Sequence, residues 1–170
     1  MALSFFSALF IYFPVIKMYF FPTKIILEDD QPYISIEKIH ASAPLLFDID
    51  PWDKTLYENA LEKGVAHAKG SDKPGGDGTV YLFAHSSALP WEITRLNTSF
   101  FRLHELTKGD TIDVFDGEKK YTYKVREKKT IAPREIQYLQ KDQGKILILQ
   151  TCTPIGTDWN RLLVFADLVE

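Results

Sequence analysis

The segment KILILQTCTPIGTDWNRLLVFADLV, residues 145–169, decides most of the fold that we expect. It contains two runs of mostly apolar residues, 145–151 and 161–169, which have the length and composition of buried strands. The linker between them is rich in turn-forming residues. A chemically reactive or charged residue stands at the edge of each strand, since Cys152 follows the first run and Arg161 opens the second.

Earlier parts of the sequence add further strands and two short helices. TVYLFA (79–84) is a third apolar run, and two alternating segments flank Asp116-Gly117, a dipeptide typical of a type I′ hairpin turn. Strands are predicted at 23–28, 33–39, 43–49, 111–117 and 119–127, helices within 53–64 and 93–106, and a turn-rich loop at 70–78. About eight short strands with two small helices favour a mainly β fold, closed or nearly closed into a barrel.

The composition limits the possible partners. The 170 residues carry a net charge of −3, and no run of Lys or Arg marks a surface for nucleic acid. We therefore expect no nucleic-acid partner. Cys152 is the only cysteine, which excludes an intrachain disulfide. A free thiol outside the cytosol is an oxidation risk, and it is retained only where it is buried, harmless or needed.

Residues 1–22, MALSFFSALFIYFPVIKMYFFP, form a hydrophobic segment in which Lys17 is the only charged side chain. Its length approaches the ~20 residues that span a bilayer, so we expect a membrane-anchoring helix over 1–22 and a separate β-barrel domain over 23–170. The segment lacks the basic leading region of a secretory signal peptide. Two alternatives stay open: an apolar helix that packs on the domain or on a partner, and an anchor whose true start lies upstream.

His85 follows the run 79–84 in the same way that Cys152 follows its strand, so both side chains stand where a strand ends. The sheet holds such residues rigidly while they reach solvent. A thiol becomes a nucleophile when it loses its proton, and a nearby imidazole accepts that proton and can protonate a leaving amine. Arg161, nine residues after Cys152, offers permanently charged N–H donors for the oxyanion formed when an amide is attacked. These residue types together predict acyl transfer.

Thr151 and Thr153 flank the cysteine and are candidate supporting groups for substrate or oxyanion. Thr151 offers a hydroxyl or its backbone, and the Thr153 N–H is a candidate second oxyanion donor. Each residue of the site also has a simpler interpretation when taken alone. A lone cysteine at the end of a buried strand is more often a packed apolar side chain than a nucleophile.

Three other histidines compete with His85 for the proton-transfer role. His104 lies among charged residues and His40 follows a predicted strand, so both are expected at the surface. His67 is the main alternative, because it lies in the predicted loop region just before the His85 strand.

The sequence resembles the sortase family over roughly residues 33–169. ILQTCTP (148–154) followed by RLLVFA (161–166) resembles the family's strand that ends in Thr-Leu-x-Thr-Cys and precedes an Arg opening the next strand. GTVYLFAHSS (78–87) resembles its strand that ends in the catalytic His. Leu149, Thr151 and Cys152 fit the pattern, whereas Ile148 replaces its first Thr; the segments 39–46, 61–78 and 101–125 are also similar to family motifs.

The resemblance implies an eight-stranded sortase β-barrel, held by one N-terminal helix in the cell membrane with its catalytic domain outside the cytoplasm. It implies cleavage of a Leu-Pro-x-Thr-Gly-like sorting motif of surface proteins after Thr, through a thioacyl-enzyme on Cys152. The acyl group would pass to an amine of a peptidoglycan precursor or of a pilin Lys. No organic cofactor is implied. Some sortases bind calcium through acidic loops, but no clustered carboxylates in this sequence predict a metal site.

Other interpretations remain. A cysteine L,D-transpeptidase usually has its nucleophile in Ser-x-Gly-Cys-x-Arg, which the residues around Cys152 do not match, and a papain-like protease has its His after its Cys. A membrane-anchored β-barrel binding module predicts that His85, Cys152 and Arg161 do not converge. The sortase subclass stays open: Asp50-Pro51-Trp52 resembles the lid tripeptide of pilin-building sortases but follows the first strands instead of preceding them.

Overall fold

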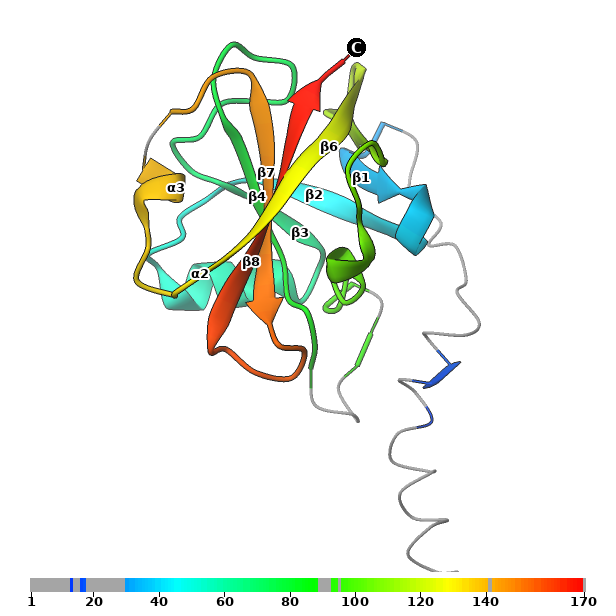
Figure 1. Ribbon diagram of the computed structural model, residues 1–170, viewed down its shortest axis with the longest axis vertical. Coiled ribbons are helices and arrows are strands. Elements are labelled where there is room, and N and C mark those ends of the chain that lie inside the picture. The colour runs from blue at the N-terminus through cyan, green and yellow to red at the C-terminus, as the bar shows by residue number, and fades with distance from the viewer. Residues whose placement is uncertain are drawn as a thin grey trace, which may run out of the picture.

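The computed structural model describes residues 30–88, 93–94, 96–140 and 142–169, together with residues 13, 16 and 17. Its strands form one closed barrel in the order β1-β2-β3-β4-β7-β8-β6-β5 (Figure 1). They are β1 (Tyr33–Ile36), β2 (Ala41–Ile49), β3 (Val65–Ala68), β4 (Val80–Phe83), β5 (Thr111–Phe115), β6 (Lys120–Ile131), β7 (Ile146–Thr153) and β8 (Asn160–Leu168). The β2–β3 and β4–β7 pairs are parallel and the others antiparallel. The predicted eight-stranded β-barrel is confirmed.

Short helices connect the strands: η1 (Glu37–Ile39), α2 (Lys54–Leu61), η2 (Leu103–Glu105) and α3 (Gln137–Gln140), of which η1 and η2 are 3₁₀ helices. The predicted helix within 53–64 is confirmed as α2. It begins where the Asp53 carboxylate accepts a hydrogen bond from the Leu56 N–H at 3.0 Å, as an N-cap does. Figure 1 shows α2 and α3 on the same side of the barrel.

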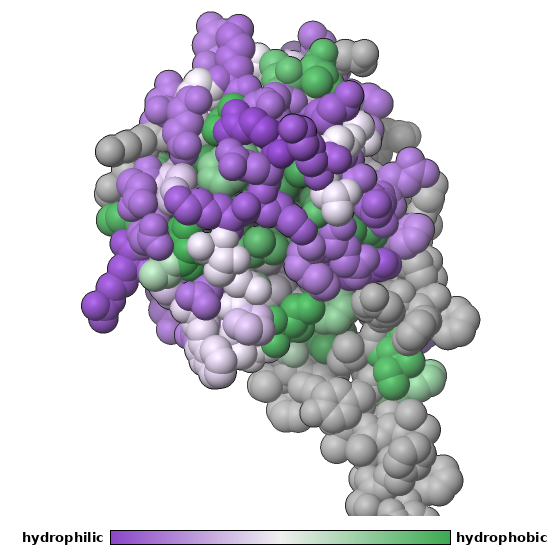
Figure 2. Space-filling view, viewed as in Figure 1, coloured by the Kyte–Doolittle hydropathy of each residue, from purple (hydrophilic) through white to green (hydrophobic). Residues whose placement is uncertain are grey.

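The barrel has two apolar cores, and β7 contributes to both. Leu147 and Leu149 belong to the inner core, which fills the barrel. Ile146 and Ile148 belong to an outer core, where the barrel wall is covered by apolar side chains of α2 and α3. Burial on both faces explains why this strand is a continuous apolar run instead of an alternating one. Hydrophilic side chains dominate the face shown in Figure 2, which agrees with this concentration of apolar residues in the cores.

One strand of the barrel, β3, was not predicted from the sequence. β3 lies in a segment predicted as loop, yet it pairs with β2 on one side and β4 on the other. Two of its four residues are Ala66 and Ala68, and alanine has little preference for strands. Tertiary pairing therefore decides this element, and its location places His67 in the barrel wall.

The predicted α-helix within 93–106 is wrong in the described residues, where 97–102 form turns that lead into η2. Local side-chain bonds explain the difference. The Thr98 hydroxyl donates to the Thr94 carbonyl at 2.5 Å, and the Ser99 hydroxyl donates to the Leu96 carbonyl at 2.7 Å. Hydroxyl and amide side chains compete in this way with regular helical bonding.

Two predicted details near the strand ends are also corrected. Residues 37–39, predicted as the end of a strand, form η1. The β5–β6 turn is not type I′, which needs positive φ at both central residues, because only Gly117 of the dipeptide has one (105°). The Asp116 carboxylate instead accepts from the N–H groups of Glu118 and Lys119, which makes a longer connection.

Two predictions concern residues that are not described. The predicted strand 23–28 and the anchor 1–22, apart from residues 13, 16 and 17, lie outside the described residues. Among the helices of the described ranges, none has both the length and the apolar character that crossing a bilayer requires.

Candidate active site

Strand register places Cys152 and Arg161 directly opposite each other. β7 and β8 are antiparallel, and Cys152 pairs with Arg161 in their register. Both side chains belong to the outer face of the barrel wall, because they continue the alternation of Ile148 on β7 and Leu163 on β8, which lie in the outer core. Opposite residues on one face of an antiparallel pair have neighbouring side chains. The thiol and the guanidinium therefore occupy adjacent positions.

The parallel pairing of β4 with β7 brings His85 to the same edge. Phe83 pairs with Gln150, and the Ala84 N–H still donates to the Gln150 carbonyl at 3.1 Å. β4 ends at Phe83, so His85 lies two residues past this pairing, in the segment that leaves the sheet at the end of β7 where Cys152 stands. Phe83 lies in the outer core, so the alternation also directs His85 to the outer face. Cys152 and Arg161 thus face each other on β7 and β8, and His85 follows the end of the neighbouring strand β4.

Electrostatics favours the neutral forms of the thiol and the imidazole. Burial raises the pKa of the Cys152 thiol; the Arg161 charge acts to lower that pKa, while Asp158 acts to raise it. Burial lowers the pKa of His85, and the carboxylates of Glu62 and Glu58 oppose that shift. No hydrogen bond joins the Cys152 sulfur to the His85 ring among the described residues. Both shifts act against the thiolate–imidazolium pair, which is the form that nucleophilic attack and proton donation require.

Arg161 is oriented by the connection between β7 and β8. Its Nη1 donates to the Asp158 carbonyl at 2.9 Å and to the Asn160 carbonyl at 3.3 Å. Within the described part of the chain, the other guanidinium N–H groups have no hydrogen bond. A planar guanidinium can donate several bonds at once, so this anchoring is compatible with donation toward an oxyanion near Cys152.

A cavity of about 420 Å³ adjoins the cysteine at the end of the barrel. It is lined by Ser86, Phe100, Phe101, His104, Thr151, Cys152, Thr153, Pro154, Ile155 and Leu162. Phe100 and Leu162 also belong to the inner core, so the cavity opens from the barrel interior toward the thiol. Its lining contains no carboxylate and no Lys or Arg, and it therefore suits an uncharged, largely apolar group.

The two threonines beside the cysteine have different surroundings. Thr151 is 4% exposed, and its hydroxyl donates to the Ala84 carbonyl at 2.9 Å, which ties β7 to the residue before His85. Thr153 is half-buried and lines the cavity. A second tie joins the same two segments, since the Gly156 N–H donates to the Ser87 hydroxyl at 3.0 Å. Sequence reasoning did not identify Ser87.

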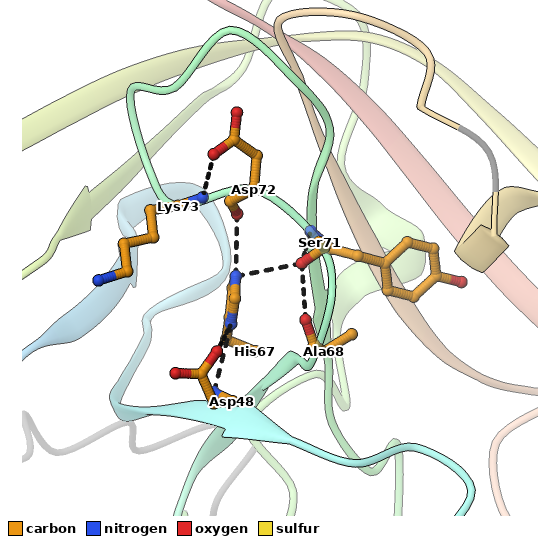
Figure 3. Close-up of polar contacts among 7 residues, drawn as sticks. Asp48, His67, Ala68, Ser71, Asp72 and Lys73 are labelled. Atoms are coloured by element: carbon orange, nitrogen blue, oxygen red, sulfur yellow. Dashed lines mark hydrogen bonds and ion pairs between the residues drawn. The ribbon is translucent and has the colours of Figure 1, made fainter.

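His67, the alternative histidine, lies among Asp48 of β2 and Ser71 and Asp72 of the loop after β3 (Figure 3). It is 1% exposed and alternates with Ala66 and Ala68 of the outer core, which puts its ring on the opposite face of the wall from Cys152. The ring accepts a bond from the Asp48 N–H at 3.4 Å and contacts the Asp72 carbonyl at 2.9 Å through Nε2. Burial lowers the pKa of His67, whereas the contacts with Asp72 and Asp48 act to raise it, and the bonds tie the ring into the fold.

Ser71 and Asp48 flank His67 in an order that superficially resembles a serine-protease triad. The Ser71 hydroxyl lies 3.1 Å from Nε2 of the ring, but it donates to the Ala68 carbonyl at 2.8 Å and accepts from the Tyr81 N–H at 3.2 Å. Because the Ser71 hydroxyl is bonded to two backbone groups, it stabilises the local structure and is not free to act as a nucleophile.

The other two histidines lie at the surface, His40 at the end of η1 and His104 on η2, as predicted. The sequence did not indicate that His104 would line the cavity. In the described ranges, no three His, Cys, Asp or Glu side chains are grouped as metal ligands would be.

Comparison with known proteins defines the class. The sortase domain model matches residues 34–169, so this chain belongs to the sortase family. Members of that family are cysteine transpeptidases. Sortase D of Bacillus subtilis (strain 168) is 29% identical over 140 residues, which cover 80% of this chain and 62% of that protein. The chain thus spans less than two thirds of that relative's length.

Solved sortase structures share the fold. Sortase C1 from Streptococcus agalactiae is 31% identical, with a TM-score of 0.67 over 86% of this chain and 71% of that one. Sortase A from Corynebacterium diphtheriae is 29% identical, with a TM-score of 0.67 over 82% of this chain and 60% of that one. Relatives named sortase A, C and D match at similar identity, so the subclass remains unassigned.

Proposed function

We propose that this chain is a sortase-type transpeptidase in which Cys152 is the nucleophile, His85 transfers protons and Arg161 stabilises the oxyanion. The observation that carries the proposal is the pairing of Cys152 with Arg161 across β7 and β8, together with the β4–β7 register that directs His85 to the same edge. A binding module without catalysis has no need to align these three residue types on one face of the barrel.

The first half of the reaction forms a thioester. The Cys152 thiolate attacks the carbonyl carbon of the scissile peptide bond, and the resulting oxyanion is stabilised by the Arg161 guanidinium and by the Thr153 N–H as a second donor. The intermediate collapses with cleavage of the C–N bond. The protonated His85 ring gives its proton to the departing amine, so the acyl group remains on sulfur and His85 becomes neutral.

The second half transfers the acyl group. An incoming amine attacks the thioester carbon while neutral His85 accepts the proton that the amine loses. The C–S bond breaks, the thiolate of Cys152 is restored, and a new amide is released. His85 ends protonated, as it began, so no external oxidant, reductant or cofactor enters the balance.

The substrate in this proposal is a sorting motif resembling Leu-Pro-x-Thr-Gly on surface proteins, cleaved after Thr. The acceptor is an amine of a peptidoglycan precursor or a pilin Lys; a solved relative, a sortase C of Group B Streptococcus, is described as pilus-related. The cavity beside Cys152 is lined mainly by apolar and hydroxyl side chains, which suits apolar peptide side chains. The apolar segment 1–22 supports a single-pass membrane location with the barrel outside the cytoplasm.

A peptide-library assay with an amine acceptor, analysed by mass, tests the proposal. The expected products identify the motif, the scissile bond and the ratio of transfer to hydrolysis. Cys152→Ala should abolish turnover and the trapped thioacyl-enzyme. Arg161→Lys should keep the charge but lose most of the rate, because an ammonium lacks the planar fork of donors. Equal turnover by wild type and Cys152→Ala would refute catalysis, and binding without turnover would favour the binding-module alternative.

A further inference from the structure

The C-terminal end of α2 packs beside the strand that leads to His85. The Tyr57 ring of α2 meets the Phe83 ring in an edge-to-face contact, with ring centres 6.4 Å apart. Leu61 is buried in the same outer core as Phe83. Phe83 is two residues before His85 and lies on the same face. Glu62, the C-cap residue of α2, is therefore carried to the edge where the candidate catalytic residues lie.

The Glu62 carboxylate is held by a buried side chain. Asn97 is 1% exposed, and its Nδ2 donates to Glu62 Oε2 at 3.2 Å. The amide is itself oriented, because its Oδ1 accepts from the Thr94 N–H at 2.8 Å. The same turn segment binds the histidine backbone, since the Phe100 N–H donates to the His85 carbonyl at 3.3 Å. One segment thus fixes both Glu62 and His85.

The charges that face His85 come from α2. Glu62 has the largest electrostatic effect on the imidazole and Glu58, one turn earlier, the next; both raise the pKa that burial lowers. Glu58 also forms an ion pair with Lys54, in which the Lys54 Nζ lies 3.7 Å from the Glu58 carboxylate. From β7 and β8, Cys152 and Arg161 occupy the same face. Glu62 is thus the carboxylate with the larger effect on His85, and Asn97 holds it in place.

We propose that Glu62 is a positioning residue for His85: its carboxylate, held by Asn97, stabilises the protonated imidazole that must deliver a proton to the leaving amine. This inference rests on the proposed function. It assigns a task to a residue outside the Cys-His-Arg group, because a half-buried imidazole resists the charge that its role in acid catalysis requires.

Direct titration of the His85 ring tests the electrostatic part without reference to activity. Glu62→Gln removes the charge but keeps an oxygen that can accept from Asn97, and Glu118→Gln removes an equal charge at the remote β5–β6 turn. Ring resonances followed by NMR should show that His85 titrates at lower pH in Glu62→Gln and as in wild type in Glu118→Gln. Glu62→Asp, which keeps the charge, should titrate closer to wild type than Glu62→Gln. An unmoved His85 titration in folded Glu62→Gln overturns the inference.

The pH profile of kcat/KM tests the consequence for catalysis. Because the active form needs protonated His85 and ionised Cys152, Glu62→Gln should lower the rate near neutral pH by about two- to fivefold, the range expected for partly exposed charge pairs. The acidic inflection should move to lower pH, and rates well below it should converge with wild type. A uniform loss at every pH means a purely structural role and overturns the inference. Failure of the proposed function itself would appear separately, as absent turnover in wild type, while the NMR titration would still report on Glu62.

Discussion

The hydroxyl of Thr151 provides the most direct test of how the site is assembled. It donates to the Ala84 carbonyl at 2.9 Å in a buried contact between residues 67 apart in the sequence. Thr151→Val replaces the hydroxyl with a methyl group of similar size and leaves a buried carbonyl without this donor. Loss of such a partner costs about 1–3 kcal/mol of the free energy of unfolding. The bond joins the residues that precede Cys152 and His85, so its loss should also loosen β4 against β7 locally.

Thr157→Val is the matched control. Its hydroxyl also donates to a backbone carbonyl, that of Pro154 at 2.8 Å, but at an exposed position where water can replace the lost bond. We expect the control to change stability by less than about 0.5 kcal/mol. The chemistry removed is the same in the two variants, and only the burial of the acceptor differs.

Urea unfolding measures the effect as a shift of the midpoint at constant slope. Amide hydrogen exchange supplies a local measure, because the Ala84 N–H bonds to the Gln150 carbonyl at 3.1 Å and should exchange faster in Thr151→Val. If Thr151→Val and Thr157→Val shift the midpoint equally, or if Ala84 exchange is unchanged, the β4–β7 tie does not contribute in the way the structure indicates.

Two pH-dependent predictions follow from His67, which is buried, and from Cys152, which is half-buried. Burial lowers the pKa of His67 in the folded state, so its contribution to stability is complete above the unfolded value of about 6.5 and is lost as pH falls toward the folded value, at up to about 1.4 kcal/mol per pH unit. Denaturant unfolding at a series of pH values should show a shallower acid decline in His67→Gln than in wild type; equal slopes in the two proteins contradict the assignment. Burial raises the pKa of Cys152 and Asp158 acts in the same direction, so Asp158→Asn should move the pH dependence of thiol alkylation to lower pH, and a shift to higher pH would reverse that assignment.

Local sequence patterns predicted an element correctly wherever its burial requires a recognisable run of apolar residues. The runs around Tyr81, Leu149 and Val164 are apolar because both faces of their strands are buried, and each was predicted as a strand. The capping position of Asp53 likewise follows from local chemistry alone, since the bond it makes lies three residues away. The strand-end positions of His85 and Cys152 were recognisable for the same reason, since each directly follows such a run.

Elements without a local signal were missed. β3 contains little besides Val and Ala around His67, so its strand conformation comes from pairing with β2 and β4. The segment containing Asn97 has apolar residues at helical spacing, but its polar side chains bond to nearby backbone and break the helix. Glu62 could not be singled out, because its bond to Asn97 spans 35 residues.

The amino-acid sequence by itself determined that this is a β-barrel with a cysteine, a histidine and an arginine at strand boundaries. Buried strands are runs of apolar residues, and polar or turn-forming residues stand where those runs end, so both are visible in the local composition. Only the tertiary structure decided that Cys152 and Arg161 face each other on β7 and β8, and that the strand leading to His85 lies next to β7. That arrangement depends on the parallel register of β4 with β7 and the antiparallel register of β7 with β8. Register is set by how whole strands pack, and a shift of one residue would turn each side chain to the opposite face.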